Sequence, residues 1–389
     1  MKNEMHECLT NNILHFWLER MIDRERGGFY GRIDGNDHIV ADAEKGAILN
    51  ARILWAFAAA YRALGDHRYL DAALRAKEYI LNHFVDKEYG GVYWSLNADG
   101  TPKDTKKQSY AIGFTIYGMS ELARATGDKE ALDCALSLYN SIEEHAFDAK
   151  NNGYIEALTR DWQPIADMRL SDKDENGSRT MNTHLHIIEP YTNLYRVAPS
   201  PELKERLVNL LHIFTDRLLN KQTNHLDLFF NDEWQGRRNI QSFGHDIEAS
   251  WLLHETALVL ADKDVLQWIE PVVKNVAVAA DEGLLDDGSM IYERWTDTGK
   301  TDRSLQWWVQ CENIIGHVNL WQHFGKEACL SIAARCWNYT KTRLVDQKNG
   351  EWYWSINEDG SVNHSDDKAG FWKCPYHNTR MCLEIMERM

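Results

Sequence analysis

Polar and aromatic side chains stand out of place in six apolar stretches of the sequence, each with the spacing of a helix. One such residue alone is most often a satisfied structural group, but a set at six matching places indicates a binding or catalytic site. The set consists of Arg52, then Tyr110, then Asn182, His184, His186 and Glu189, then His245 and Glu248, then Trp308 and Glu312, and finally Trp372 and His377.

Two members of this set, His245 and His377, suit proton transfer near neutral pH, because imidazole both takes and gives a proton there. In the open-chain form of a reducing sugar, the C1 aldehyde makes the proton on C2 acidic. A base removes that proton, and the enediolate becomes the other epimer when an acid returns a proton to the opposite face. Two histidines flanking C2 therefore predict an epimerisation that needs little else.

Three neighbouring residues would support this reaction. Arg52 and His186 can stabilise the negative charge that develops on O1 and O2. Glu248 lies three residues after His245, on the same helical face, and is expected to orient that imidazole and raise its basicity.

Nucleotide and acyl-transfer chemistry lack their motifs, since the sequence has no GxGxxG, GxxxxGK[ST] or GxSxG. His184, His186 and Glu189 form a possible metal-binding set, but histidines two apart on a helix point to different faces. HExxH is also absent. We therefore expect neither a cofactor nor a catalytic metal.

Composition limits the partners and the compartment. The net charge is −16 and no Lys/Arg run offers a surface for nucleic acid. The amino end is polar and acidic, and the most apolar stretch, 53–60, is too short to span a bilayer. Seven cysteines without a CxxC spacing fit reduced thiols in the cytoplasm, with Cys8, Cys134 and Cys336 as small core residues.

An aromatic, turn-rich phrase recurs along the whole chain, and markers within it are spaced by 62, 63 or 73 residues. Each copy alternates side chains around a turn, which predicts a small β-hairpin. The copies are GGFYGRIDGN (27–36), GGVYWSLNADG (90–100), NGYIEALTRDW (152–162), HLDLFFNDEW (225–234), GSMIYERWTDTG (288–299) and GEWYWSINEDG (350–360).

About fifty residues of each unit carry helical periodicity, as in 46–64, 69–84 and 248–261. Each unit therefore supplies two helices, which must pack on the neighbouring units. This predicts an all-α fold, an (α/α)6 barrel with short β-hairpins at one end, spanning 1–389 as a single catalytic domain. An open solenoid is the alternative, but six copies without a polar capping repeat favour closure.

The odd residues follow their hairpin markers by roughly equal distances. If the repeats are equivalent, these residues project from the same end of the inner helices and converge at one mouth of the barrel. The 15 tryptophans add a further hint, because the flat C–H faces of sugar rings stack on aromatic side chains.

Four segments together resemble the N-acylglucosamine 2-epimerase superfamily: GGFYGRIDG (27–35), MNTHLHIIEPY (181–191), GHDIEASWLL (244–253) and KAGFWKCPYHNTR (368–380). The run Cys374–Asn378 matches the CPYHN-type signature of its cellobiose 2-epimerase branch. The resemblance implies reversible, cofactor-free epimerisation at C2 of the reducing-end glucose of β-1,4-linked disaccharides through a cis-enediolate. Cellobiose would give glucosyl-mannose, and lactose would also be a substrate.

The resemblance also implies roles for individual residues and a monomer or weak dimer. His245 and His377 would be the acid/base pair, with His377 assisting ring opening, and His184 would be structural or lie behind the site. The expected substrate-binding residues are Tyr110, Asn182, Trp308, Glu312 and Trp372.

Three alternatives stay open. The same enediolate serves an N-acylglucosamine 2-epimerase or a mannose-type aldose–ketose isomerase. A glycoside hydrolase would use two carboxylates from among Asp174, Glu248 and Glu312. A non-catalytic scaffold would bind sugar through its aromatic side chains alone. The segment 167–179 is a candidate mobile flap over the site.

Overall fold

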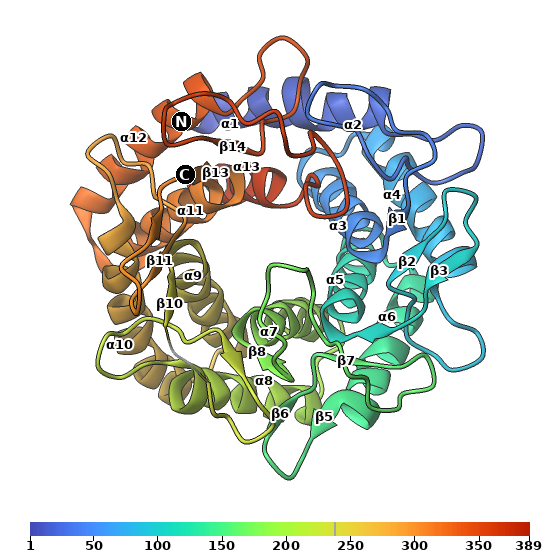
Figure 1. Cartoon of the computed structure of the whole chain (residues 1–389), viewed down its shortest axis with the longest axis horizontal. Coiled ribbons are helices and arrows are strands. Elements are labelled where there is room, and N and C mark those ends of the chain that lie inside the picture. The colour runs from blue at the N-terminus through green and yellow to red at the C-terminus, as the bar shows by residue number, and fades with distance from the viewer. Residues whose placement is uncertain (237–238) are drawn as a thin grey trace.

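The helices form two concentric rings in the computed structural model, which describes residues 1–236 and 239–389 (Figure 1). The inner ring surrounds the central axis and its members come from six successive units of the chain. In the described residues it consists of α3 (Ala47–Leu64), α5 (Ser109–Thr126), α7 (Met181–Val197), α9 (Phe243–Leu260), α11 (Trp307–Phe324) and α13 (His377–Arg388).

The outer ring covers the inner one, and several of its helices finish in a short π-helical or 3-10 turn. Its members are α4 (His67–Tyr79) with η2 (Ile80–Phe84), α6 (Lys129–Ser141) with η3 (Ile142–Ala146), α8 (Pro201–Ile213) with η4 (Phe214–Leu218), α10 (Lys263–Ala280) with η5 (Asp281–Gly283), and α12 (Glu327–Arg343). The amino-terminal α1 (Lys2–Glu7), η1 (Cys8–Ile13) and α2 (Leu14–Arg20) complete the ring.

Burial distinguishes the two rings. In α3 every residue from Ala47 to Ala60 is buried, as expected for a helix enclosed between neighbours and an outer layer. In α4 only one face is buried, and the opposite face is charged. Inner helices end sharply: α3 and α5 stop at Gly65 and Gly127, whose φ values of 72° and 75° are left-handed and suit glycine.

Short antiparallel strands connect neighbouring units at the end of the barrel where the inner helices begin. The residue before each of the first five inner helices pairs with a hairpin residue of the next unit. These pairs are Gly46–Ser95, Gln108–Ala157, Thr180–Phe229, Ser242–Glu293 and Gln306–Ser355.

The strands have two or three residues each. They are β1 (Lys45–Gly46), β2 (Ser95–Leu96), β3 (Pro102–Asp104), β4 (Lys107–Gln108), β5 (Phe147–Asp148), β6 (Gly153–Tyr154), β7 (Ala157–Leu158), β8 (Arg179–Thr180), β9 (Phe229–Phe230), β10 (Ile240–Ser242), β11 (Glu293–Trp295), β12 (Thr301–Asp302), β13 (Leu305–Gln306) and β14 (Ser355–Ile356).

Buried lysine–aspartate pairs fix three of the hairpins. Lys45 Nζ lies 3.0 Å from Asp23 Oδ2, and Lys107 Nζ lies 2.8 Å from Asp86 Oδ2. The other oxygen of Asp23 accepts two backbone N–H groups of the turn that follows it. Lys368 and Asp346 repeat the arrangement in the last unit. We call these three the hairpin pairs.

The two ends of the chain meet and close the ring. α13 packs between α11 and α3 and also against α1. Glu4 accepts hydrogen bonds from Trp337 Nε1 at 3.0 Å and Lys341 Nζ at 2.7 Å. At the strand end, Ile33 of the first hairpin bridges to Ala369. The predicted (α/α)6 barrel is confirmed, and it is a closed ring rather than a solenoid.

Individual predicted helices agree with the structure except at their ends. The prediction 46–64 corresponds to α3, and 69–84 corresponds to α4 plus its π-helical turn. The prediction 248–261 starts too late, because α9 begins at Phe243. None of the helices in the described ranges is long and apolar enough to cross a membrane.

Candidate active site

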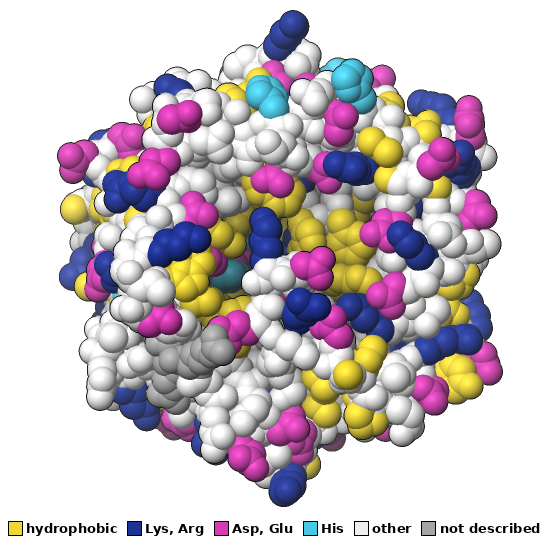
Figure 2. Space-filling model, in the orientation of Figure 1, with side chains coloured by type: hydrophobic (Ala, Val, Ile, Leu, Met, Phe, Trp, Pro, Cys, Tyr) yellow, Lys and Arg dark blue, Asp and Glu magenta, His cyan; other side chains and the backbone are white. Residues whose placement is uncertain are grey.

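The predicted residues converge at the mouth where the inner helices begin. Figure 2 shows this end of the molecule as a hollow with hydrophobic side chains on its walls and a histidine within. Hydrogen bonds and ring contacts connect members of the set from five of the inner helices, so these side chains lie together at one mouth of the barrel.

Arg52 lies on one wall of the site, nearly buried between aromatic rings. Its guanidinium carbon is 4.1 Å from the centroid of Phe114 and 4.7 Å from that of Tyr376. One of its nitrogens donates to the Tyr110 hydroxyl at 2.8 Å, whereas its buried Nε has no partner among the described residues. A fixed cation with an unused N–H suits binding of an anionic oxygen.

His186 faces this wall because α7 is kinked there. The His186 backbone has φ −93° and ψ 19°, which is not helical. Pro190, four residues later, has no N–H for the His186 carbonyl, and its ring crowds that oxygen. The carbonyl turns toward α5, where a Cβ on Gly113 would lie only 2.4 Å from it. Glycine at 113 is therefore required for this close approach.

The ring of His186 lies 5.0 Å, edge-on, from that of Tyr110, and its Nδ1 lies 3.0 Å from Glu189 Oε2. Burial lowers the pKa of His186, with Glu189 opposing this. His186 is thus neutral at pH 7. With Nδ1–H donated to Glu189, its Nε2 faces the site as an acceptor.

A layer of charge lies one helical turn deeper, centred on Arg380. Its guanidinium donates to Glu189 and Tyr376 through one nitrogen, and through the other to Glu248 and Glu312, both at 2.7 Å. Tyr376 also donates to Glu189. These five side chains, all buried, form what we call the carboxylate cluster.

The carboxylate cluster has more acidic groups than bases. Three carboxylates face a single guanidinium, so at full ionisation two negative charges would be uncompensated inside the protein. Burial and the neighbouring Glu312 raise the pKa of Glu248 well above its ordinary value. Despite burial, Arg380 and His186 hold the pKa of Glu189 down at about 2. The cluster therefore retains a proton, shared on the side of Glu248 and Glu312.

His377 is the first residue of α13, and its Nδ1 lies 2.7 Å from Glu312 Oε1 and 4.0 Å from Glu248 Oε1. Burial and the cations Arg52 and Arg380 lower the pKa of His377 well below its ordinary value. Its Nδ1 proton is held by Glu312, which leaves Nε2 for a substrate.

His245 is held differently. Its Nδ1 lies 2.8 Å from Ser242 Oγ, and its ring centroid lies 4.8 Å from Trp308. The same indole is 5.7 Å from His377, so Trp308 contacts both imidazoles. Burial and then His186 lower the pKa of His245 to about 3.

Two expected roles are wrong because of depth. Glu248 was expected to orient His245, but its carboxylate is with Arg380 and near His377. Glu312 was expected to contact substrate, but it is fully buried and also accepts from Trp251 Nε1. Glu248 and Glu312 follow mouth residues by three and four positions, and such spacing places a side chain about 5 Å further along a helix.

His184 is structural, as one of the two expectations for it stated. Its Nε2 accepts the backbone N–H of Tyr154 at 3.0 Å, and its Nδ1 lies 2.6 Å from the Thr180 carbonyl. Burial lowers its pKa to about 4. Since both ring nitrogens serve the backbone, His184 is not available as a metal ligand.

The residues expected to hold substrate surround the hollow. Trp308 and Trp372 are partly exposed, and Trp372 lies 6.0 Å from both Tyr110 and Trp94 by ring centroids. Asn182 is one turn ahead of His186, and its Oδ1 is a buried acceptor with no partner in the described ranges. An unused acceptor here suits a sugar hydroxyl.

Glu248, Glu312 and His377 also have the donor set of a metal site, with ligand atoms within 4.8 Å of one another. Both carboxylates, however, already accept from the same nitrogen of Arg380. The guanidinium provides the positive charge that a metal ion would bring, so these residues do not fit an ion without displacing it.

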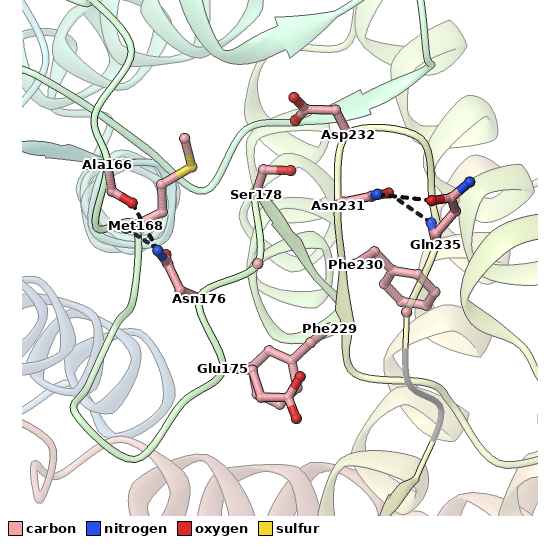
Figure 3. Close-up of a pocket in the computed structure, with 12 residues that line it drawn as sticks. Ala166, Met168, Glu175, Asn176, Ser178, Phe229, Phe230, Asn231, Asp232 and Gln235 are labelled. Atoms are coloured by element: carbon pink, nitrogen blue, oxygen red, sulfur yellow. Dashed lines mark hydrogen bonds between the residues drawn. The ribbon is translucent and has the colours of Figure 1, made fainter.

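The segment 167–179 lies near the mouth, and its base is tied to the unit before it: Gln108 Nε2 donates to the Met168 and Arg169 carbonyls at 3.2 and 3.0 Å. A cavity of about 800 Å³ lies between 166–178 and 229–236 (Figure 3). Its lining includes none of the predicted site residues. The mobility expected for this flap stays a prediction.

Arg380, Tyr376 and Ser242 were missed as functional residues. Arg380 had one sequence signal, a basic residue inside the run TRMCLEIM, whose other members are largely apolar. Ser242 directly precedes the helix that carries His245, where a serine is read as an ordinary helix cap. Sequence spacing alone does not reveal that the carboxylate partners of Arg380 and Tyr376 belong to other helices.

Comparison with known proteins finds relatives that match nearly the whole chain. The family model described as N-acylglucosamine 2-epimerase (GlcNAc 2-epimerase) matches residues 28–380. A cellobiose 2-epimerase of Bacteroides fragilis is 58% identical, over 99% of this chain and 98% of that protein. The solved structure of cellobiose 2-epimerase from Bacillus thermoamylovorans is 40% identical, with a TM-score of 0.94 over 100% of this chain and 99% of that one. A D-mannose isomerase structure, 21% identical with a TM-score of 0.88, covers 100% of this chain and 98% of that one, and shares the fold.

Proposed function

The chain belongs to the N-acylglucosamine 2-epimerase family and is a carbohydrate epimerase or isomerase, and from this premise we propose that it is a cellobiose 2-epimerase. Its substrates are β-1,4-linked disaccharides, cellobiose and also lactose, whose reducing-end glucose becomes mannose. Support for the disaccharide comes from relatives of that activity that match over nearly the whole chain.

One observation carries the mechanism: His245 and His377 both lie against Trp308, and each has its Nδ1 on an oxygen atom. This leaves each Nε2 for the substrate, and C2 of the open-chain sugar would lie between the two imidazoles. One imidazole removes the C2 proton, and the other returns a proton to the opposite face of the cis-enediolate. In the reverse reaction they exchange roles.

The two imidazoles are not equivalent. Burial, Arg52 and Arg380 disfavour the imidazolium form of His377, whereas the Glu312 carboxylate on its Nδ1 favours that form. Of the two imidazoles, His377 is therefore the one with a carboxylate to stabilise the proton that an acid carries. His245 has only a hydroxyl on Nδ1 and stays neutral, as a base must. This asymmetry also suits His377 to opening the sugar ring by protonating the ring oxygen.

The enediolate oxygens need positive charge and hydrogen-bond donors. Arg52 provides a cation that Tyr110 and the rings around it hold in place. His186, as a neutral acceptor, binds a hydroxyl beside it. The inner helices all begin at this end, so their positive dipole ends add to the stabilisation.

The sugar rings would stack on Trp308 and Trp372, and Asn182 would accept from a hydroxyl. Hydrolysis fits this geometry poorly. Arg380 bonds to both Glu248 and Glu312, whereas a glycosidase pair needs open space for the scissile bond between two carboxyl groups. Asp174 bonds to its own segment through Ser171.

We propose four further features of the protein, which concern its domain and oligomeric state, its cofactor, its partners and its location. The whole chain, 1–389, acts as one catalytic domain and as a monomer or weak dimer. It uses no cofactor, since proton transfer needs none, and its net charge of −16 disfavours nucleic acid. All seven cysteines are free thiols, which supports a cytoplasmic location.

The test is proton NMR of cellobiose incubated with chelator-treated protein in D2O. The proposal requires a mannose-ended epimer with deuterium at C2. A ketose product would make the protein an isomerase, and released glucose would make it a hydrolase. Turnover of mannose or N-acetylmannosamine alone would assign it to a sister branch and overturn the disaccharide proposal.

A further inference from the structure

Ser242 occupies the N-cap position of α9 but does not cap the helix. A serine there ordinarily accepts a backbone N–H of the first turn. Thr180, at the same place before α7, does so, accepting from Thr183 N at 3.0 Å. Ser242 makes no such bond among the described residues, and its hydroxyl lies 2.8 Å from His245 Nδ1 instead.

Directly opposite Ser242 stands Glu293. The two are register partners in the antiparallel pair β10–β11, so their side chains project from the same face, with Cβ atoms about 5 Å apart. At the four other strand-paired junctions described here, this position holds no acid. The residues there are Ser95, Ala157, Phe229 and Ser355.

Glu293 is half-buried among other acidic groups. Asp302 of β12 is its register partner on the other side, and Asp174 of the segment 167–179 and Tyr292 also face it. Burial raises the pKa of Glu293 to about 7, with Asp302 and Asp174 adding to the rise, while the neighbouring hydroxyls of Tyr292 and Ser242 oppose it.

We propose that Ser242 and Glu293 are positioning residues that select the tautomer of His245. When Glu293 is ionised, the Ser242 O–H is directed to its carboxylate, and the serine oxygen must then accept from His245 Nδ1–H. The lone pair of His245 is thereby left on Nε2, which makes it a base toward the sugar. When Glu293 is protonated, the Ser242 hydroxyl is free to donate to Nδ1, and Nε2 carries the proton. This inference rests on the proposed function only for the direction of catalysis.

The Ser242–Glu293 pair beside His245 affects its imidazole differently from the way Glu312 affects that of His377. A carboxylate directly on Nδ1, such as Glu312 provides, would also stabilise the imidazolium form. A hydroxyl between the carboxylate and the imidazole fixes the tautomer and delivers little of that charge. The neutral base His245 is therefore connected to its carboxylate, Glu293, through the Ser242 hydroxyl and not directly.

The direct test is ¹⁵N NMR of the full-length, substrate-free protein with labelled histidine, with His245 signals identified by their loss in His245→Gln. We expect Nδ1–H, Nε2-unprotonated imidazole in the wild type at pH 8, and a mixed or Nε2–H tautomer in Ser242→Ala. An Nε2–H wild type, or an unchanged tautomer in Ser242→Ala, would overturn the inference. Since no turnover is needed, the inference survives or fails separately from the proposed function.

Kinetics provide the second readout. Ser242→Ala should lower kcat by roughly 10- to 100-fold, the range usual for loss of a residue that orients an imidazole, with KM little changed. Ser242→Thr keeps a hydroxyl and should recover most of the rate. Ser355→Ala is the matched control, a serine at a strand-paired junction of another unit, and should stay within about twofold. Equal rate losses in Ser242→Ala and Ser355→Ala would indicate a merely structural serine.

Glu293→Gln tests the acid through the pH profile. In the wild type, kcat should fall as pH drops through about 7, because protonated Glu293 releases the Ser242 hydroxyl. His245 and His377, with lowered pKa values, do not titrate in that range. The variant should lose this limb. A limb that persists unchanged in Glu293→Gln would remove Glu293 from the proposal.

Discussion

The hairpin pairs and the carboxylate cluster are both buried arrays of charge, but they differ in their acids: the pKa values of Asp23 and Asp346 are lowered, whereas in the cluster that of Glu189 is lowered and that of Glu248 is raised. In each hairpin pair the aspartate has at least one cation for its single charge, Lys45 for Asp23 and Lys107 with Arg160 for Asp86, and backbone N–H groups complete the shell of the carboxylate. Although burial acts against it, the pKa of Asp23 and that of Asp346 are lowered by these partners. In the cluster, Glu248 has a raised pKa.

The ratio of charges accounts for the difference. A balanced pair fixes both partners in the charged form and stabilises one backbone geometry, which is why it recurs at hairpins. Three acids around one guanidinium leave an excess of negative charge that a proton relieves. A proton retained at neutral pH beside His377 is what acid catalysis requires.

The largest expected effect is on turnover, when one of the two catalytic imidazoles is removed and the charged residues of the hairpin pairs and the carboxylate cluster are left unchanged. His377→Ala and His245→Ala should each lower turnover by about 10²- to 10⁴-fold, the usual contribution of a general acid or base. Rates with cellobiose and far-UV circular dichroism check this. Either variant retaining more than about a tenth of the wild-type rate would rule out its acid/base role.

Next comes stability. Arg380→Met leaves three buried carboxylates without their cation and should cost about 3–5 kcal/mol in urea unfolding, with activity lost. Lys45→Met leaves Asp23 with its two backbone donors and should cost less, while the folded protein keeps its kcat. If Lys45→Met lowered kcat as Arg380→Met does, the separation of structural from functional charge would be wrong.

A smaller effect is expected for the loss of stability at low pH that involves Asp23. Because the folded-state pKa of Asp23 is depressed, its contribution is present above its unfolded pKa of about 3.9 and is lost as pH falls through the folded value. Asp23→Asn should therefore cost roughly 1.5–3 kcal/mol at pH 7 and progressively less as the pH falls below about 3.9. Unfolding free energies over this pH range measure this, and a cost independent of pH would contradict it.

The smallest effect is expected for Glu248, whose contribution to stability changes with pH in the opposite direction to that of Asp23. The pKa of Glu248 is raised, so its contribution is full below its unfolded pKa of about 4.3 and is lost as pH rises toward the folded value. Glu248→Gln stays neutral and should lose less stability than the wild type between pH 5 and 9. Parallel melting-temperature curves for the two proteins would show that Glu248 is ionised throughout.

The sequence predicts the architecture because each repeat is recognisable from local patterns, a turn-rich phrase and helical periodicity. The phrases around Gly28, Gly91 and Gly350 predict hairpins, and the helical periodicity between them predicts paired helices. Closure follows, since each pair has an apolar face to bury. The start of α9 was misplaced because Gly244 and the polar His245 weaken the periodicity of its first turn.

The sequence predicts which residues meet in the site better than it predicts which side chains they bond to. Arg52, His186, His245 and His377 meet as expected, since equivalent helices begin at one end. The partner of His377 was not predictable, because it depends on the rotation and depth of a different helix. Glu312, placed with the substrate, supports His377 for this reason.

Ring closure ties catalysis to the order of folding. α13 carries His377 and Arg380, packs on α11 and α3, and receives α1, so its docking joins positions as distant as Arg52 and Cys374, 322 residues apart. Contacts of such sequence separation form late, because loop-closure entropy must be overcome first. A refolding chain should therefore regain helical circular dichroism well before turnover, and the lag would report the sealing of the ring.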